Sequence, residues 1–320
     1  MSSRLALFLF GLAAPLVVAC SASVTPAPGQ LMVVLGTDMT PGRDFTLLRM
    51  TVDDPRVSTV LENSWAFRPV GNGRFAGDTT LPATVAIVGV PGAGGVVTKI
   101  RVEALLEGAV RVVREANVVI PQSGVHTLRM TVDWLCWDRL PVSVSTSGPL
   151  ACPDDKTCAN GTCESSSVAE SDLTPFDAAQ VFGGDAGAGA CFDVLRCFRG
   201  GTVVRPSNVS QRCSIPLAGD ASRLNVAVRM PPAVTRGFCG KDACLVPLDR
   251  GAGGWTVDGA SIVLPPAVCT DVRALEVVTT TACAPKGPEL PACGEWSSAT
   301  GGNDGNDPTF TLDLREAVPR

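Results

Sequence analysis

Most of the side chains on which common catalytic sites depend are missing from this sequence. Tyrosine is absent, and His126 is the only histidine in 320 residues. The chain has no Gly-x-Ser-x-Gly elbow, His-Glu-x-x-His motif or phosphate loop, and no lysine follows a serine by three residues. Because nucleophilic catalysis needs a base beside the nucleophile, His126 is interpreted as a surface or turn residue. We therefore predict that the protein is not an enzyme.

Charge and metal-binding patterns are also sparse. Charged residues make up 18% of the chain, the formal net charge is -5, and the basic residues are scattered. This distribution argues against a nucleic-acid partner. The 13 cysteines contain no Cys-x-x-Cys pair, which together with the single histidine argues against zinc or an iron–sulfur cluster. We expect no cofactor, apart from the calcium alternative described below.

The apolar run at the start of the chain is too short to cross a bilayer. Residues 5–16 are apolar, follow Arg4 and lead through small residues to Cys20, which is the pattern of a secretory signal. The cysteine directly after Ala19 resembles a bacterial lipoprotein signal. That resemblance implies a signal peptide over 1–19, removed before Cys20, which then carries lipid such as palmitate and holds the protein on the membrane. A plain secreted protein, cut near Ala22 or Ser23, is the alternative.

Residues 20–30 contain Ser, Ala, Thr, Pro and Gly and are predicted to form a flexible tether. In the lipoproteins that the start resembles, serine rather than aspartate after the lipidated cysteine implies the outer membrane, and residue 21 is serine. We therefore expect a lipid-anchored protein of the cell envelope, held at the periplasmic or the surface face of the outer membrane.

Without Cys20, an even set of cysteines remains, which outside the cytosol predicts disulfides. Spacing does not choose among the pairings, although the neighbours Cys191–Cys197 and Cys239–Cys244 are the simplest guesses. The predicted disulfide cysteines are Cys136, Cys152, Cys158, Cys163, Cys191, Cys197, Cys213, Cys239, Cys244, Cys269, Cys283 and Cys293.

The composition and the hydrophobic pattern both predict an all-β fold. Glycine and proline supply 33 and 25 residues, well above their usual share of ~12%, as expected for short strands joined by tight turns. Period-two alternation in 97–105 and 127–134, for example, indicates strands with one wet face. We predict an N-terminal antiparallel, Ig-like β-sandwich over 31–135.

One hexapeptide occurs twice. Leu-Arg-Met-Thr-Val-Asp spans 48–53 and recurs identically at 128–133, but the flanking residues do not match. We therefore interpret the two copies as similar strands in similar environments and not as a domain repeat.

The remainder of the chain divides by its cysteines. Residues 136–170 hold four cysteines and the turn signal Asn160-Gly161, which predicts a linker and a small disulfide-stapled module. Residues 171–320 hold eight cysteines and weaker strand patterns, including 223–230, 261–264 and 309–314. We predict a disulfide-rich β domain there.

Several segments together resemble uncharacterised surface lipoproteins of GC-rich soil bacteria. They are the lipoprotein start, the cysteine-free β domain, the module around 152–163, and the sequences Val181-Phe-Gly-Gly, Cys191-Phe-Asp, Cys197-Phe and Ala243-Cys-Leu-Val-Pro-Leu-Asp. The resemblance covers nearly the whole chain. It implies an envelope location and no catalytic residues.

Three sets of residues are candidates for chemistry. Carboxylates at Asp53-Asp54, Asp154-Asp155 and Glu103 with Glu107 could serve a hydrolase acting on glycosides, or could be solvated turn residues. Asp304, Asn306 and Asp307, in the run 303–307, are a weak calcium site or simply a flexible turn. Trp65, Trp255 and Trp296 could stack on sugars or pack internally, whereas Trp134 is expected in the core and Trp137 against a disulfide.

The resulting hypothesis is a non-catalytic, lipid-anchored envelope protein with a binding or structural role. Its partner would be an envelope protein or a surface glycan. A calcium- or carbohydrate-dependent adhesion module is the alternative, and a hydrolase using Asp53, Asp154 or Glu103 comes third.

Overall fold

The structure is a computed structural model that describes residues 29–317, apart from 58–59, 70–74, 91, 93, 141–151, 183–190, 210–211, 235, 252, 271–275, 295 and 298–308. The predicted signal peptide, Cys20 and the calcium candidates Asp304, Asn306 and Asp307 lie outside the described residues. Within the described part, no helix is both long and apolar enough to span a membrane.

The described chain consists mainly of strands, which confirms the all-β prediction. The sandwich strands are β1 (Gln30–Thr37), β2 (Leu47–Asp53), β3 (Leu61–Pro69), β4 (Phe75–Gly77), β5 (Ala83–Val88), β6 (Val97–Leu106), β7 (Ala109–Val119), β8 (Val125–Val132) and β22 (Thr309–Asp313). The cysteine-rich segment contains η1 (Trp134–Cys136), β9 (Lys156–Ala159), β10 (Thr162–Ser165), β11 (Ser167–Val168), η2 (Glu170–Asp172) and β12 (Thr174–Pro175).

The strands of the C-terminal domain are β13 (Thr202–Val204), β14 (Ser207–Val209), β15 (Arg212–Pro216), β16 (Asn225–Met230), β17 (Phe238–Cys239), β18 (Cys244–Leu248), β19 (Thr256–Asp258), β20 (Ser261–Val263) and β21 (Glu276–Thr280). The helical turns are α1 (Ala178–Phe182), α2 (Val194–Cys197), η3 (Ala221–Arg223), η4 (Pro232–Val234), α3 (Pro266–Thr270) and α4 (Leu314–Ala317).

Two sheets form the sandwich, in the orders β12-β8-β1-β5-β22 and β11-β7-β6-β2-β3-β4. The alternation read from the sequence matches their inner faces: Ile100 and Val102 on β6 and Met130 and Val132 on β8 are buried. The sandwich is not purely antiparallel, however, because β1 pairs in parallel with β8. This parallel pair matters below because it brings the carboxyl ends of two strands together.

The cysteine-rich segment packs on the sandwich. Its β9–β10 hairpin turns at Asn160-Gly161, where both residues have positive φ, and disulfides Cys136–Cys158 and Cys152–Cys163 hold it. The next strands, β11 and β12, then add to the edges of the two sandwich sheets. The module is therefore bound to the sandwich by backbone pairing as well as by sulfur.

The C-terminal domain contains the sheets β13-β21-β16-β18-β17 and β14-β15-β20-β19. The prediction assigned all of 171–320 to this domain. The structure differs at both ends of that range, since β12 pairs with β8 and β22 pairs in parallel with β5 of the sandwich. The chain thus leaves the sandwich, forms the C-terminal domain, and returns to the sandwich.

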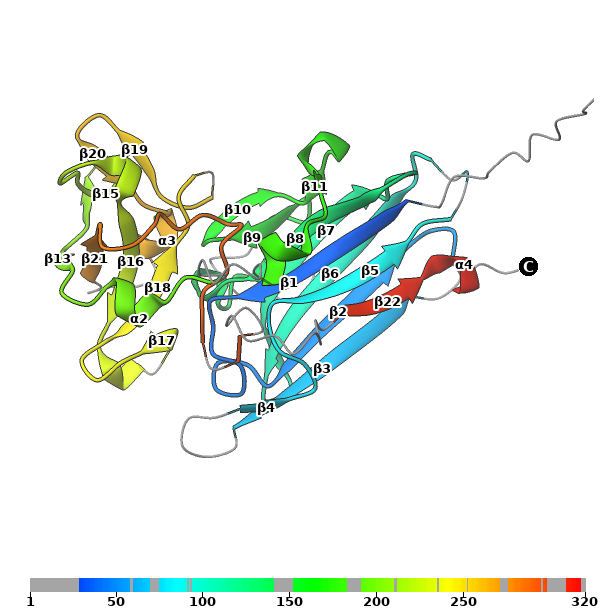
Figure 1. Cartoon of the computed structure of the whole chain (residues 1–320), viewed down its shortest axis with the longest axis horizontal. Coiled ribbons are helices and arrows are strands. Elements are labelled where there is room, and N and C mark those ends of the chain that lie inside the picture. Colours follow the sequence, from blue (N-terminus) through cyan, green and yellow to red (C-terminus); the bar gives the residue numbers. More distant parts are fainter. Residues whose placement is uncertain are drawn as a thin grey trace, which may run out of the picture.

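Figure 1 shows the sandwich and the C-terminal domain side by side along the long axis. Strand β1 begins at the end of the sandwich that is farthest from the C-terminal domain and runs toward it. The junction between the two units therefore lies at the carboxyl end of β1.

Candidate functional site

Two aspartates meet at the junction because of the parallel strand pair. Thr37 lies opposite Val132 in the β1–β8 register, so Asp38 and Asp133, the next residues of the two strands, lie side by side. The Trp134 N–H donates to Asp38 Oδ1 at 2.6 Å, and the Asn160 N–H donates to Asp133 Oδ2 at 2.9 Å. Strand register and module together place a carboxylate pair at one end of the sheet.

Burial dominates the electrostatics of this pair. Removal from water raises the pKa of Asp133 to about 6. The hydrogen bond from Asn160 and the positive charge of Arg114 lower this pKa, but by less than burial raises it. Burial also raises the pKa of Asp38 well above its usual range, and the neighbouring Asp133 raises it further. Both shifts arise because an ionised carboxylate loses hydration and faces a like charge.

The C-terminal domain closes over the pair with charges of both signs. Asp249 after β18 forms an ion pair with Lys286, and both side chains are largely buried. Arg129, on the outer face of β8, lines the same cavity. Three carboxylates and two cations thus line the cavity, and this excess of negative charge accords with the raised pKa values of Asp38 and Asp133.

The cavity among these groups has a volume of about 50 Å³. A water needs roughly 10–15 Å³ of such volume, so the space holds a few waters. Organic ligands occupy pockets of ~300–1,000 Å³. We interpret the junction cluster (Asp38, Asp133, Asp249, Lys286 and Arg129) as a buried, proton-holding contact between domains and not as a substrate site.

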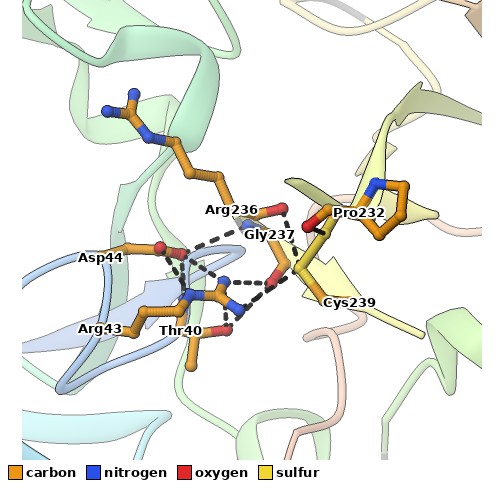
Figure 2. The surroundings of a disulfide bond; sticks show 8 residues. Thr40, Arg43, Asp44, Pro232, Arg236, Gly237 and Cys239 are labelled. Carbon is orange, nitrogen blue, oxygen red and sulfur yellow. Dashed lines mark hydrogen bonds and ion pairs between the residues drawn. A yellow bond between two sulfur atoms is a disulfide. The ribbon is translucent and has the colours of Figure 1, made fainter. Parts of the chain in front are cut away.

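A second set of contacts, which we term the Gly237 clasp, fastens the same two units (Figure 2). The Gly237 carbonyl accepts from Thr40 Oγ1 at 2.9 Å and from Arg43 Nη2 at 2.5 Å, and its N–H donates to Asp44 Oδ2 at 3.3 Å. Arg43 also donates to Cys239 Sγ of the β17–β18 disulfide at 3.4 Å. The clasp therefore joins the loop after β1 to the start of β17, the strand that this disulfide links to β18.

Gly237 can occupy this position because it has no side chain. Its φ is 73°, and a Cβ there would lie 2.6 Å from the Leu245 carbonyl oxygen. Beside it, the Arg236 guanidinium stacks on Trp137 of the cysteine-rich segment at 4.4 Å from the ring centroid. We predicted that Trp137 packs against a disulfide and did not predict this cation–π contact. The contact links the cysteine-rich segment to the C-terminal domain.

A groove large enough for a ligand lies on the C-terminal domain. In β16, Val226 and Val228 point into the core, while Ala227 and Arg229 belong to the opposite face of the sheet. Helix α2 packs on β17 and β18. Beside it, a groove of about 450 Å³ runs between the loop 198–201 and the β17–β18 hairpin at 240–243.

The groove is apolar inside and positively charged at its rim. Leu195 and Val203, which are 40% and 46% exposed, line it together with the buried Leu245. Its charged lining residues are Arg199, Arg229, Lys241 and Asp242. Arg229 forms an ion pair with Glu276, whereas Arg199 and Lys241 make no ion pair within the described part of the chain.

A second hollow of about 310 Å³ shares Arg229 and Asp242 with the groove and continues it to Pro231 and Pro232. Because they share lining residues, the two hollows are adjacent; we call the one of about 450 Å³ the main groove and the two together the C-terminal groove. Sequence patterns did not indicate it, because its walls come from four segments that are separated along the chain.

The carboxylates considered for hydrolysis do not form a site. Glu103 lies on the outer face of β6 in ion pairs with Arg49 and Arg101, and Glu107 is in the exposed turn between β6 and β7. Asp53 is exposed, while the adjacent Asp54 is buried against Arg56 and Thr98. Asp154 and Asp155 are both exposed. None of these carboxylates lines the junction cavity or the C-terminal groove.

The tryptophans proposed as sugar-stacking platforms are internal. Trp65, Trp255 and Trp296 are buried, as is Trp134, which confirms the internal-packing interpretation. Trp65 packs against Phe310 of β22, and Trp296 against Phe238. His126 lies on β8, half-buried. These rings support the fold and present no stacking surface.

All twelve predicted disulfide cysteines are paired. The local pair Cys239–Cys244 is confirmed. The guess Cys191–Cys197 is wrong, because Cys191 bonds to Cys293 and Cys197 to Cys283. Cys213–Cys269 completes the set. Across the described ranges, no group of three or more His, Cys, Asp or Glu side chains is arranged to hold a metal ion.

No protein-family model, curated protein or solved structure matches this chain. The functional argument therefore depends on the geometry of the junction and the groove.

Proposed function

We propose that this chain is a non-catalytic, lipid-anchored protein of the cell envelope that binds a partner through its C-terminal groove. The observation that carries the proposal is the main groove, which is about 450 Å³ in volume and bordered by the exposed side chains Leu195 and Val203. Exposed apolar side chains that border a hollow of this size are typical of binding sites.

The architecture supports this assignment. The lipoprotein-like start implies an anchor at Cys20, and β1 begins at the end of the sandwich opposite the C-terminal domain (Figure 1). The sandwich would then serve as a spacer that holds the groove away from the membrane. The domain-spanning contacts at the junction cluster and the Gly237 clasp would keep that spacer rigid.

The groove is tested by site-specific photo-crosslinking in intact cells of the source organism. A benzophenone amino acid replaces Leu195 in the groove, and Val257 on β19 is the control because the two side chains are 40% and 39% exposed on the same domain. We expect one or two envelope proteins to crosslink at Leu195 and not at Val257. The same products at both positions, or none at Leu195, would refute binding through the groove.

The anchor is tested separately. The mature N-terminal peptide should begin at Cys20 with a lipid mass, and Cys20→Ser should release the protein from the membrane fraction. An unmodified mature chain that begins near Ser23 would instead support plain secretion.

A further inference from the structure

We propose that the occupant of the C-terminal groove is an extended polypeptide segment in which acidic and apolar residues alternate. This inference rests on the proposed binding function and specifies its partner class. It follows from the charge, the apolar lining and the shape of the groove.

The charge of the groove is opposite to that of the chain. The protein carries a formal net charge of -5, yet the main groove is lined by Arg199, Arg229 and Lys241 against Asp242. Glu276 neutralises Arg229, which leaves Arg199 in the loop after α2 and Lys241 in the β17–β18 hairpin against Asp242, an excess of one positive charge. Arg199 and Lys241 attract carboxylates of a ligand that lies in the main groove, whereas Asp242 and Glu276 line the adjoining hollow.

The interior requires an apolar counterpart. Leu195 and Val203 expose large apolar surfaces to the groove, and Val278 and Leu245 lie beneath them. A purely ionic ligand would leave these side chains in water. In an extended peptide successive side chains point to opposite sides. A peptide in which apolar and acidic residues alternate therefore directs its apolar side chains into the groove and its carboxylates toward the cations at the groove rim.

The shape favours a polypeptide over a sugar chain. The main groove adjoins the hollow at Pro231 and Pro232, with which it shares Arg229 and Asp242, so a linear ligand has room to extend beyond the main groove. The groove crosses the face of the C-terminal sheet, because Val203 on β13 pairs with Val278 on β21, Arg229 on β16 pairs with Leu245 on β18, and all four residues line it. Among the described lining residues Phe198 is the only aromatic one, and it is buried, so none of them offers a ring for sugar stacking.

The test uses fluorescein-labelled synthetic octapeptides and the purified full chain with its disulfides intact. Fluorescence anisotropy compares alternating Glu–Val, Lys–Val and Glu–Ser peptides. We expect the Glu–Val peptide to bind at least about tenfold more tightly than either of the others, with affinity falling as salt screens the rim cations.

Matched variants locate the binding. Arg199→Glu and Lys241→Glu should each weaken Glu–Val binding about tenfold, whereas Arg223→Glu changes the same charge at an exposed position of the same domain outside the groove and should leave it unchanged. Equal thermal stability of the three variants shows that the fold is retained.

Equal binding of Glu–Val and Lys–Val peptides, no Glu–Val binding, or groove variants that bind like the parent chain would overturn the acidic partner class. If a partner still crosslinks at Leu195 in cells in that case, the proposed function survives without this inference. If nothing crosslinks at Leu195, the proposed function fails, and the partner class fails with it.

Discussion

Replacing Asp133 by asparagine should remove a defined part of the pH dependence of stability. The substitution keeps a carbonyl oxygen that can accept the Asn160 N–H, and it removes the charge that burial opposes. Asp133 is 5% exposed, so solvent does little to relieve this cost in the native protein.

The magnitude follows from the pKa. Asp133 titrates at about 6 in the folded chain, against 3.8 for the unperturbed group. Below both values each state is protonated, and the group does not favour unfolding. As the pH rises from 3.8 to 6, the unfolded chain loses its proton first. The native state therefore loses about 3 kcal/mol of stability across this window, and the loss stays constant above it.

The assay is urea denaturation with intact disulfides, at about pH 3, which is below both pKa values, and at about pH 7.5. On moving to the higher pH, the parent chain should lose about 3 kcal/mol more unfolding free energy than Asp133→Asn. Asp53→Asn is the control, because it removes the same charge from an exposed position at the end of the identical hexapeptide. Equal pH dependence in the parent and Asp133→Asn would refute the buried-proton interpretation of the junction.

Three further predictions concern the fold. Gly237→Ala should destabilise the chain by about 3 kcal/mol in thermal or urea denaturation, because the new Cβ meets the Leu245 carbonyl. Its control is Gly219→Ala, which should cost about 1 kcal/mol because Gly219 also has a positive φ of 83° but has open space around it. Phe310→Ala should cost about 2 kcal/mol through its lost contact with Trp65, and Thr311→Ala on the same strand under about 0.5 kcal/mol; equal costs would contradict the packing of β22. Alkylation before reduction should label no cysteine of the mature protein, and peptide mapping should find Cys191 linked to Cys293, whereas a free thiol or a Cys191–Cys197 peptide would contradict this pairing.

The sequence alone determined the strands and which of their faces are buried, because both depend on the order of neighbouring residues. Side chains alternate across a strand with a period of two residues, so the buried side of 97–105 and 127–134 could be read directly. The Asn160-Gly161 turn and the even cysteine count are also local or compositional signals. They predicted the hairpin of the module and the number of bridges.

Features that join distant segments were decided by the tertiary structure. Cys191 bonds to Cys293 rather than to its neighbour Cys197, and β22 pairs with β5 of the sandwich rather than with a strand of its own domain. Spacing cannot identify such partners, because any pairing that the folded backbone brings within reach is compatible with the same sequence.

The repeated hexapeptide shows this division most directly. In both copies Leu, Met and Val point into the sandwich core, as the shared pattern requires. The final aspartate is exposed as Asp53 in β2, but as Asp133, after β8, it is buried beneath the C-terminal domain and shifted in pKa. Six identical residues thus fixed which way their side chains point. Only the packing of another domain, which buries one copy and leaves the other in water, decided which aspartate has a raised pKa.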